Sequence, residues 1–313
     1  MTLTVGVDIG GTKVLAAVVN SRGEIAARAV RGTDPEAGVG SIVAALEDLL
    51  GQGGQEVAGI GIGAAGFVEH PSGRMTFSPN VAYERPEIAE VVAARFGLPV
   101  NVENDANAAA WAEYRFGAAR GADHMLMVTV GTGVGGGMVI EGELYRGARG
   151  FAAEFGHMTL MDGGPQCTCG ERGCLEALAS GTAIARMARE GVGGAPDSIL
   201  PELSGEVPSR ITGALVSEAA RAGDEFAVEV LERAGRWLGM ALANLVNAFD
   251  PEIIVVGGSG AEAGYPFLQA VRMELDKRVG PRRPPPKIVT AGLGNDAGVI
   301  GASALVRIAA GID

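Results

Sequence analysis

The chain has 313 residues, of which 47% are hydrophobic and 20% are charged, and its formal net charge is -12. This size and composition are typical of a globular protein with one large or two medium cores. The acidic balance argues against a nucleic-acid coat or an anionic membrane surface, so we expect neither nucleic acid nor membrane as a partner.

Glycine is about twice as frequent as its usual share of about 7%, with 50 residues in 313, and many glycines end apolar runs, which indicates tight turns. The chain enters a strand at once, so we expect no targeting segment. Residues 124–140 form the longest uncharged run, which is interrupted by five glycines and is too short to span a bilayer well. These features, with clustered cysteines, favour the cytoplasm.

The first motif is a glycine turn between two predicted strands, residues 3–9 and 14–19. The turn reads Asp8-Ile9-Gly10-Gly11-Thr12-Lys13. Because a strand follows it, the turn is not a Walker loop, which requires G-x-x-x-x-G-K-[ST] before a helix. Its tip presents backbone N–H groups, a hydroxyl, a carboxylate and an ammonium. A plain Gly-Gly hairpin with incidental charges is an equally good interpretation of this turn alone.

A second glycine turn, residues 131–137, also joins two predicted strands, residues 124–130 and 138–145. The repetition suggests an internal duplication, in which two similar halves each contribute a glycine-rich turn to one cleft. Two segments match the dinucleotide pattern G-x-G-x-x-G, but neither is followed by the helix that this pattern requires, so we reject a Rossmann site. The matching glycines are Gly61, Gly63 and Gly66, and Gly131, Gly133 and Gly136.

The sequence Glu103-Asn104-Asp105 precedes an alanine-rich segment that predicts a helix. Asn104 or Asp105 is therefore expected at the helix N-cap, which is a sufficient structural explanation for both residues. The same geometry suits catalysis, because the helix dipole favours the ionised carboxylate and the helix holds it where it can accept a proton.

All three cysteines, Cys167, Cys169 and Cys174, lie within eight positions, and His157 lies ten residues before the first of them. A Cys3His set is typical of a closed tetrahedral zinc site, which would be structural. A disulfide would leave one cysteine over, and free structural thiols are the other alternative. A metal would fix the loop between Glu154 and Glu176.

The remaining chain is predicted to be mostly helical, with helices at residues 175–190, 209–222 and 224–249 and an exposed loop at 191–208. A strand at residues 253–256 ends in Gly257-Gly258-Ser259-Gly260 before a predicted helix. A glycine turn at a helix N-terminus suits a phosphate or nucleotide, although an ordinary connection explains it as well.

Together these motifs resemble the ROK family of sugar kinases and regulators over essentially the whole chain. The most specific match is the pair Glu154-Phe155-Gly156-His157 and Cys167-x-Cys169-Gly170-x-x-Gly173-Cys174-Leu175-Glu176. The resemblance implies an α/β, actin/hexokinase-like ATPase fold, with two domains of duplicated topology and a cleft between them. We expect residues 1–105 and 296–313 to form the small domain, and residues 106–295 to form the large one.

The resemblance also implies roles for individual residues. Asp105 would be the general base on the sugar hydroxyl. The residues expected to hold the sugar are Gly66, Asn104, Asp105, Glu154, His157 and Glu176. The residues expected to bind ATP and its Mg²⁺ are Asp8, Gly10, Gly11, Thr12, Lys13, Gly131, Thr132, Gly133, Gly257, Gly258 and Ser259. The expected ligands of a structural Zn²⁺ are His157, Cys167, Cys169 and Cys174.

Within the family the chain is most similar to the glucokinase branch, which implies ATP-dependent phosphorylation of glucose at its 6-hydroxyl. A kinase for another hexose, such as N-acetylmannosamine, is the main alternative. A sugar-responsive transcriptional repressor is disfavoured, because the first strand begins by residue 3 and the charge is acidic. The family implies a homo-oligomer, a dimer or a tetramer.

Overall fold

The computed structural model describes residues 2–34, 36–51, 56–78, 87–258, 260 and 264–312. The chain divides into two compact units. The first unit comprises residues 1–126, 137–153 and 292–313, and the second comprises residues 127–136 and 154–291. This division differs from the predicted one, which assigned residues 106–126, 137–153 and 292–295 to the large domain. The helix after Asp105 packs on the first sheet, and Gly137 packs against that helix.

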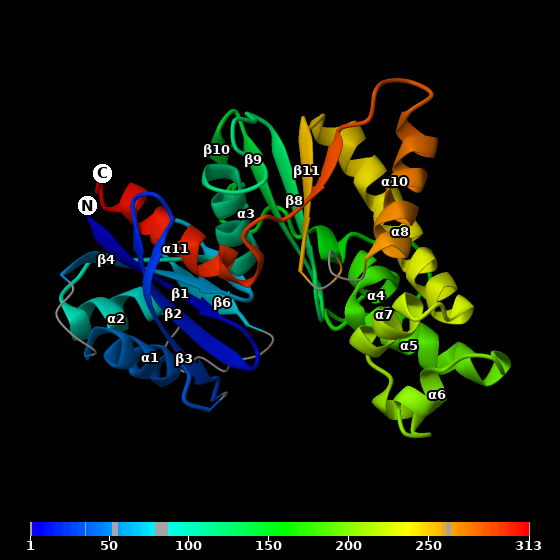
Figure 1. Ribbon diagram of the computed structural model, residues 1–313. Coiled ribbons are helices and arrows are strands. Elements are labelled where there is room, and N and C mark those ends of the chain that lie inside the picture. The colour runs from blue at the N-terminus through cyan, green and yellow to red at the C-terminus, as the bar shows by residue number, and fades with distance from the viewer. Residues whose placement is uncertain are drawn as a thin grey trace. The chain divides into compact units, whose positions relative to one another are not determined.

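The first unit contains a five-stranded sheet in the order β3-β2-β1-β4-β7 (Figure 1). Its strands are β1 (Leu3–Ile9), β2 (Lys13–Asn20), β3 (Ile25–Gly32), β4 (Val57–Ala64) and β7 (Val100–Asn104). Strand β1 runs antiparallel to β2 and parallel to β4. The predicted strand–glycine turn–strand unit is therefore confirmed. A small separate hairpin is formed by β5 (Phe67–Glu69) and β6 (Arg74–Phe77).

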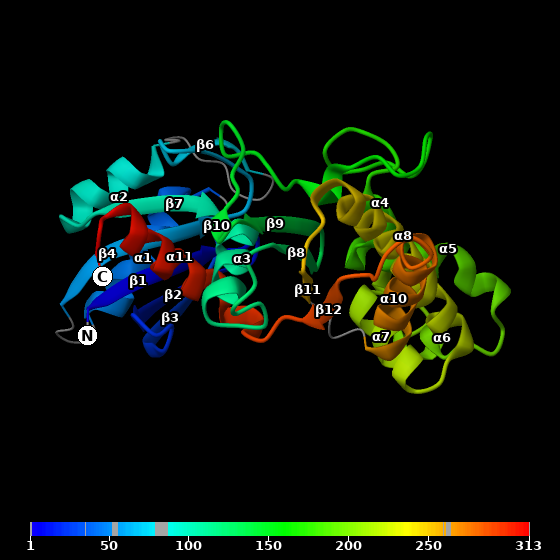
Figure 2. The ribbon, with the colours of Figure 1, turned by 90° about the horizontal axis from the view of Figure 1, so that it is seen from above.

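One face of this sheet carries branched apolar side chains and is covered by α1 (Val39–Gly51) and α2 (Ile88–Phe96) (Figure 2). Because side chains alternate along a strand, every second residue of β1 faces this core. Val5, Val7 and Ile9 are at most 3% exposed and share a cluster with Ile42 and Leu46 of α1.

The opposite face carries glycines, which let α3 (Asp105–Arg115) and α11 (Ala297–Ala309) approach the strands closely. A Cβ atom on Gly6 would lie 1.8 Å from the carbonyl oxygen of Val299, and one on Gly61 would lie 1.8 Å from that of Ala302. Gly63 faces α3 near Asp105. Gly61 and Gly63, which matched the dinucleotide pattern, therefore serve helix packing.

The second sheet has the order β10-β9-β8-β11-β12, which repeats the order of the first sheet strand for strand. Its strands are β8 (Met125–Val130), β9 (Val134–Ile140), β10 (Glu143–Leu144), β11 (Ile253–Gly257) and β12 (Lys287–Thr290). In both sheets a glycine turn joins the central strand to its antiparallel neighbour. The predicted duplication of topology is confirmed.

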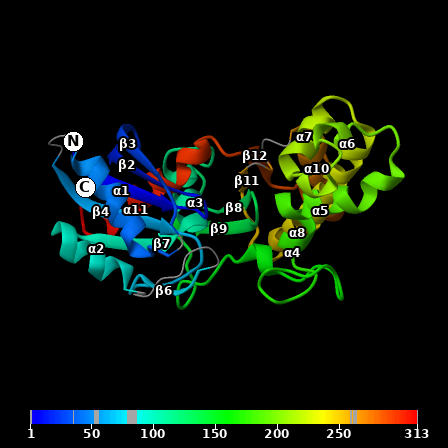
Figure 3. The ribbon, with the colours of Figure 1, turned by 90° about the horizontal axis from the view of Figure 1, so that it is seen from below.

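Among the described residues of the second unit, the helices with given bounds are α4 (Leu175–Ala179), α5 (Gly181–Gly191), α6 (Leu200–Leu203), α7 (Gly213–Arg221), α8 (Glu225–Phe249) and α10 (Tyr265–Val279) (Figure 3). Short 3-10 turns are η1 (Phe155–His157), η2 (Val192–Gly194) and η3 (Pro208–Arg210); η4 (Gly294–Asp296) belongs to the first unit.

Helix α8 begins as predicted at Asp224, whose carboxylate accepts the N–H of Ala227 at 2.9 Å. The predicted helix at residues 175–190 is wrong as one element, because Ser180 ends α4 and caps α5 by accepting the N–H of Ala183 at 3.1 Å. Over the part of the chain that the structure describes, no helix has the length and apolar character needed to cross a bilayer.

Candidate active site

In the first unit, the end of β7 brings Asn104 and Asp105 next to Gly66. Asn104 is the N-cap of α3, since its side-chain oxygen accepts the N–H of Asn107 at 3.0 Å. Its amide nitrogen donates to the carbonyl oxygen of Gly66 at 3.1 Å. Gly66 has φ 127°, a conformation that favours glycine. Because Asn104 caps the helix, Asp105 is not needed as its cap.

Sequence reasoning missed Glu103, which is 3% exposed and supports this arrangement. One carboxylate oxygen accepts the backbone N–H of Asn104 and the side-chain amide of Asn107, both at 3.1 Å. The other oxygen accepts from Arg146 at 2.6 Å. A buried carboxylate with three donors is a rigid support for the N-terminus of α3. The only sequence signal was a charged residue at the end of a buried strand.

Asp8 and Asp105 are the two perturbed carboxyl groups of this region. The pKa of Asp8 is raised to about 7, mainly by burial and also by the neighbouring charge of Asp105, while the ammonium of Lys13 opposes both effects. Burial also raises the pKa of Asp105, and the N–H of Ala106 counteracts this by donating to it at 2.9 Å. A carboxylate that is costly to keep ionised is a stronger base.

Asp8 should make the folded protein less stable as the pH rises from about 4 to about 7. Over this window the folded state keeps a proton that the unfolded state has lost, since the pKa of Asp8 rises from 3.8 to about 7 on folding. With allowance for partial exposure, Asp8→Asn should raise the free energy of unfolding by about 1–2 kcal/mol more at pH 8 than at pH 5. Urea unfolding at both pH values measures this, and an equal gain at both would contradict it.

The first glycine turn is closed by hydrogen bonds at its base and open at its tip. The N–H of Gly10 donates to the carbonyl oxygen of Lys13 at 3.0 Å, and the Thr33 hydroxyl donates to the carbonyl of Gly10 at 2.7 Å. Gly11, Thr12 and Lys13 are exposed. A fixed base with an accessible tip is what a phosphate-binding turn requires.

In the second unit, the other glycine turn borders a pocket of about 390 Å³. The carbonyl of Gly131 accepts the N–H of Gly181 at 2.8 Å, and the carbonyl of Thr132 accepts the hydroxyl of Thr182 at 2.8 Å. The pocket continues along α7 from Gly213 to Arg221 and also touches Gly260. The N-terminus of α7 lies near the glycine turn, since a Cβ atom on Gly213 would lie 2.8 Å from the carbonyl oxygen of Gly181.

The third glycine motif follows β11 and lies against β8. Gly258 has φ 74°, and a Cβ atom there would lie 2.5 Å from the carbonyl oxygen of Val130. Val130 and Gly260 both line the pocket beside the second turn, which places this motif next to Gly131 and Thr132. Ser259, which was predicted to bind ATP, lies outside the described residues.

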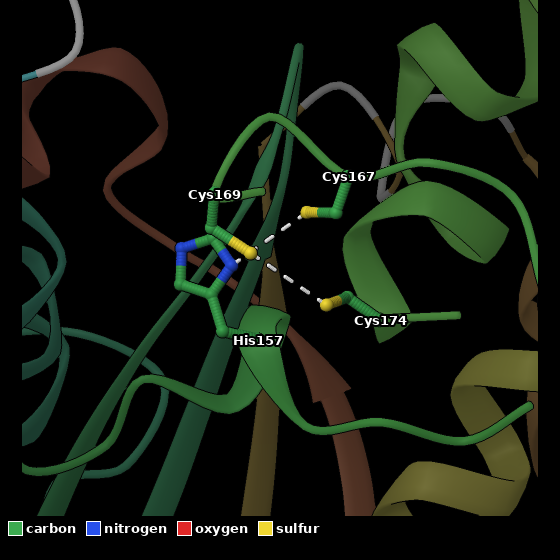
Figure 4. A group of neighbouring side chains, drawn as sticks. All are labelled: His157, Cys167, Cys169 and Cys174. Atoms are coloured by element: carbon green, nitrogen blue, oxygen red, sulfur yellow. Dashed lines mark hydrogen bonds between the residues drawn. The ribbon is translucent and has the colours of Figure 1, made fainter. Parts of the chain in front are cut away.

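The predicted metal ligands, His157, Cys167, Cys169 and Cys174, bring their ligand atoms within 4.8 Å of one another (Figure 4). The sulfur atoms of Cys169 and Cys174 are 3.8 Å apart, and the sulfur of Cys167 is 3.8 Å from Nδ1 of His157. A tetrahedron with metal–sulfur bonds of about 2.3 Å has sulfur–sulfur edges of about 3.8 Å. The residues therefore fit one tetrahedral ion, and the cysteines are free thiols, not a disulfide.

The protonation of these thiols agrees with a cation site. Burial raises the pKa of Cys174 to about 12, and the sulfur atoms of Cys169 and Cys167 add to this shift. Burial also raises the pKa of Cys167. The thiols of Cys167 and Cys174 are therefore costly to ionise without a cation, whereas a bound metal ion deprotonates its thiol ligands.

Glu154 and Glu176, the acids that flank the metal loop, both belong to the second unit and are partly buried. Glu154 comes directly before η1, and its carbonyl accepts the N–H of His157 at 3.1 Å. Glu176 is the second residue of α4, and its carboxylate accepts the N–H of Val134 at 3.0 Å and the hydroxyl of Thr168 at 2.9 Å.

The family profile that matches this sequence is that of the ROK family, over residues 4–309. The chain belongs to the ROK family. A glucokinase from Streptomyces coelicolor is 42% identical over 98% of both chains. The crystal structure of a ROK glucokinase from Streptomyces griseus, in complex with glucose and AMPPNP, matches with TM-score 0.89 and 42% identity, covering 98% of this chain and 99% of that one.

A ROK hexokinase structure from Thermus thermophilus matches over the full length of both chains, with 34% identity and TM-score 0.84. These likenesses and the two related sheets confirm the actin/hexokinase-like ATPase fold expected of a ROK protein. The ROK signature residues of this chain, from Glu154 to Glu176, form one connected cluster around the metal ligands.

Proposed function

We propose that this chain is a glucokinase, which transfers the terminal phosphoryl group of ATP to the 6-hydroxyl of glucose. The observation that carries the proposal is the partly buried carboxylate of Asp105 at the start of α3, next to Asn104, whose side-chain amide is held through both its oxygen and its nitrogen. Its support is the 42% identity, over 98% of both chains, to a protein named glucokinase.

In this proposal Asp105 is the general base. Its burial raises its pKa, so it accepts the hydroxyl proton more readily as the phosphoryl group moves. Asn104 holds a neighbouring sugar hydroxyl. The loop at Gly66 lies next to Asn104, because its carbonyl oxygen accepts a hydrogen bond from the Asn104 amide. Glu103 keeps both side chains in place through its bonds to the first turn of α3. Phosphoryl transfer depends mainly on such alignment.

Glu154, His157 and Glu176 are proposed to hold the other sugar hydroxyls. Nδ1 of His157 faces the sulfur atom of Cys167, which leaves Nε2 to donate to a sugar oxygen. A site that hydrogen-bonds each hydroxyl rejects sugars that lack one, because buried polar groups would then stay unpaired.

The nucleotide is proposed to lie in the second unit's pocket, with its phosphates at Gly131, Thr132 and Gly133. The N-terminus of α7, which begins at Gly213, borders the same pocket, and its backbone dipole favours an anion there. Gly257 and Gly258 form the proposed adenosine side, while Asp8 and Lys13 serve the magnesium ion and the phosphates. Mg²⁺, when bound with ATP, neutralises phosphate charge.

The Cys3His group is proposed to hold a structural Zn²⁺, because four protein ligands leave no position for a catalytic water. The ion would stiffen residues 157–174 and so fix the two acids at the ends of the loop. Reduced thiols in such a site agree with the cytoplasm as the proposed location. We also propose a dimer or tetramer, as the family implies.

A coupled assay of ADP formation with a panel of sugars tests the function. We expect kcat/KM for glucose to exceed that for N-acetylmannosamine, mannose and fructose by about tenfold or more. A control reaction without sugar measures the background rate of ATP hydrolysis. A higher kcat/KM for N-acetylmannosamine would reassign the sugar while keeping the chemistry, and no turnover with any sugar would overturn the proposal.

A further inference from the structure

The carboxylate of Glu176 joins two parts of the second unit that are far apart in sequence. One oxygen, Oε2, accepts the backbone N–H of Val134 at 3.0 Å, and Val134 begins β9 directly after residues 131–133, which form the second glycine turn in the structure. The other oxygen, Oε1, accepts the hydroxyl of Thr168 at 2.9 Å. Thr168 lies between Cys167 and Cys169 in the metal loop. One side chain thus connects the metal loop to the glycine turn.

The backbone around Val134 is packed tightly against the metal-loop region. A Cβ atom on Gly133 would lie 2.3 Å from Oε2 of Glu176. On the other side, a Cβ atom on Gly156, the residue before His157, would lie 2.1 Å from the carbonyl oxygen of Val134. The end of the glycine turn is therefore held on its N–H side by Glu176 and on its carbonyl side by η1.

We infer that Thr168 is a positioning residue for nucleotide binding, which acts through Glu176 on the glycine turn at residues 131–133. The inference rests on the proposal that this turn binds the phosphates of ATP. The hydroxyl of Thr168 donates a hydrogen bond to Glu176 and so fixes Glu176 in the rotamer that accepts the N–H of Val134. Nucleotide affinity then depends on an ordered metal loop, because Thr168 lies between two of the metal ligands and acts on the turn through Glu176.

The reason is the geometry of a charge-assisted pair of hydrogen bonds. A carboxylate with a fixed donor on each oxygen has one orientation, and a phosphate-binding turn needs its N–H groups preorganised. Without the Thr168 hydroxyl, the neighbour of Oε1 is the sulfur atom of Cys167 at 3.6 Å, which as a metal-bound thiolate has no proton to donate. Glu176 would then turn toward water and release Val134.

The test compares three variants of the full-length protein. Thr168→Val removes the hydroxyl at nearly constant shape, Thr168→Ser retains it, and Arg172→Ala changes an exposed side chain of the same loop that bonds Gln166 instead. For each variant, metal analysis gives the zinc content, and calorimetry without sugar gives the Kd of the ATP analogue AMPPNP with Mg²⁺.

We expect Thr168→Val to retain zinc and to raise this Kd about fivefold, because a hydrogen bond to a charged group is lost at a partly exposed site. Thr168→Ser and Arg172→Ala should bind the analogue within about twofold of the wild type. If Thr168→Val binds the analogue as tightly as the wild type, the inference is wrong.

A second variant keeps the inference testable if Thr168→Val disturbs the loop. Glu176→Gln retains the shape of the side chain but removes the negative charge that attracts the N–H of Val134 and the hydroxyl of Thr168. This variant should retain zinc. Its affinity for the ATP analogue, measured in the absence of sugar, should fall. Unchanged binding in this variant would overturn the inference. A wild-type protein that binds no analogue would instead refute the proposed nucleotide site.

Discussion

Asp105→Ala should lower kcat for sugar phosphorylation about a thousandfold while leaving the affinity for glucose within a few fold. A positioned base contributes roughly 10²–10⁴ to the rate of such a step, and Asp105 is a partly buried carboxylate with a raised pKa at the start of α3. Asn104, which would hold the sugar beside it, keeps its own bonds to Gly66 and Asn107 in this variant.

The measurement combines steady-state kinetics with calorimetric glucose binding. Asp105→Asn separates charge from shape, since it removes the basic group at almost constant volume. Asp197→Ala, which changes an exposed residue of the second unit, is the matched control and should keep full activity. Near-normal turnover in Asp105→Ala would refute the assignment of the base. A loss of glucose binding alone would make Asp105 a binding residue.

Cys169→Ser should abolish stoichiometric zinc binding and lower both activity and stability. With three ligands left, the Cys3His set no longer closes around the ion, and the metal's binding energy no longer stabilises residues 157–174. We expect the melting temperature to fall by about 5–10 °C. The acids Glu154 and Glu176 lose their fixed positions at the same time, so activity falls with stability.

Metal analysis and thermal melts with and without added zinc measure this effect. Glu171→Ala, at an exposed position of the same loop, is the control and should behave as the wild type. A native protein with less than about one zinc ion per chain after purification in zinc-containing medium would contradict the proposed site. Unchanged melting of Cys169→Ser would show that the ion does not stabilise the loop.

Features that depend on neighbouring residues could be predicted from the sequence. Three cysteines within eight positions identified the metal group, and two strand–glycine turn–strand segments identified the duplicated topology. The sequence alone allowed either Asn104 or Asp105 to be the N-cap of α3. The choice was resolved only by the hydrogen bond from the N–H of Asn107 to Asn104.

Features that depend on distant contacts could not be predicted. The sequence does not show that α3 packs on Gly63 of the first sheet, so residues 106–126 were assigned to the other domain. The hydrogen bond between Glu176 and Val134 joins residues 42 positions apart, and no periodic pattern in the sequence predicts it. Ser180 divides a helical segment because its side chain caps a new helix, which its neighbours do not reveal.

Helix α11 has a consequence for how the protein is made. It covers the glycine face of the first sheet, where Val299 and Ala302 contact Gly6 and Gly61, which are almost 300 and 240 positions earlier in the chain. A nascent chain emerges from the ribosome in order, so the part of that face which α11 covers, at Gly6 and Gly61, stays exposed until residues 297–309 appear. The first unit is thus begun first and completed last, and chaperones have that interval in which to bind it.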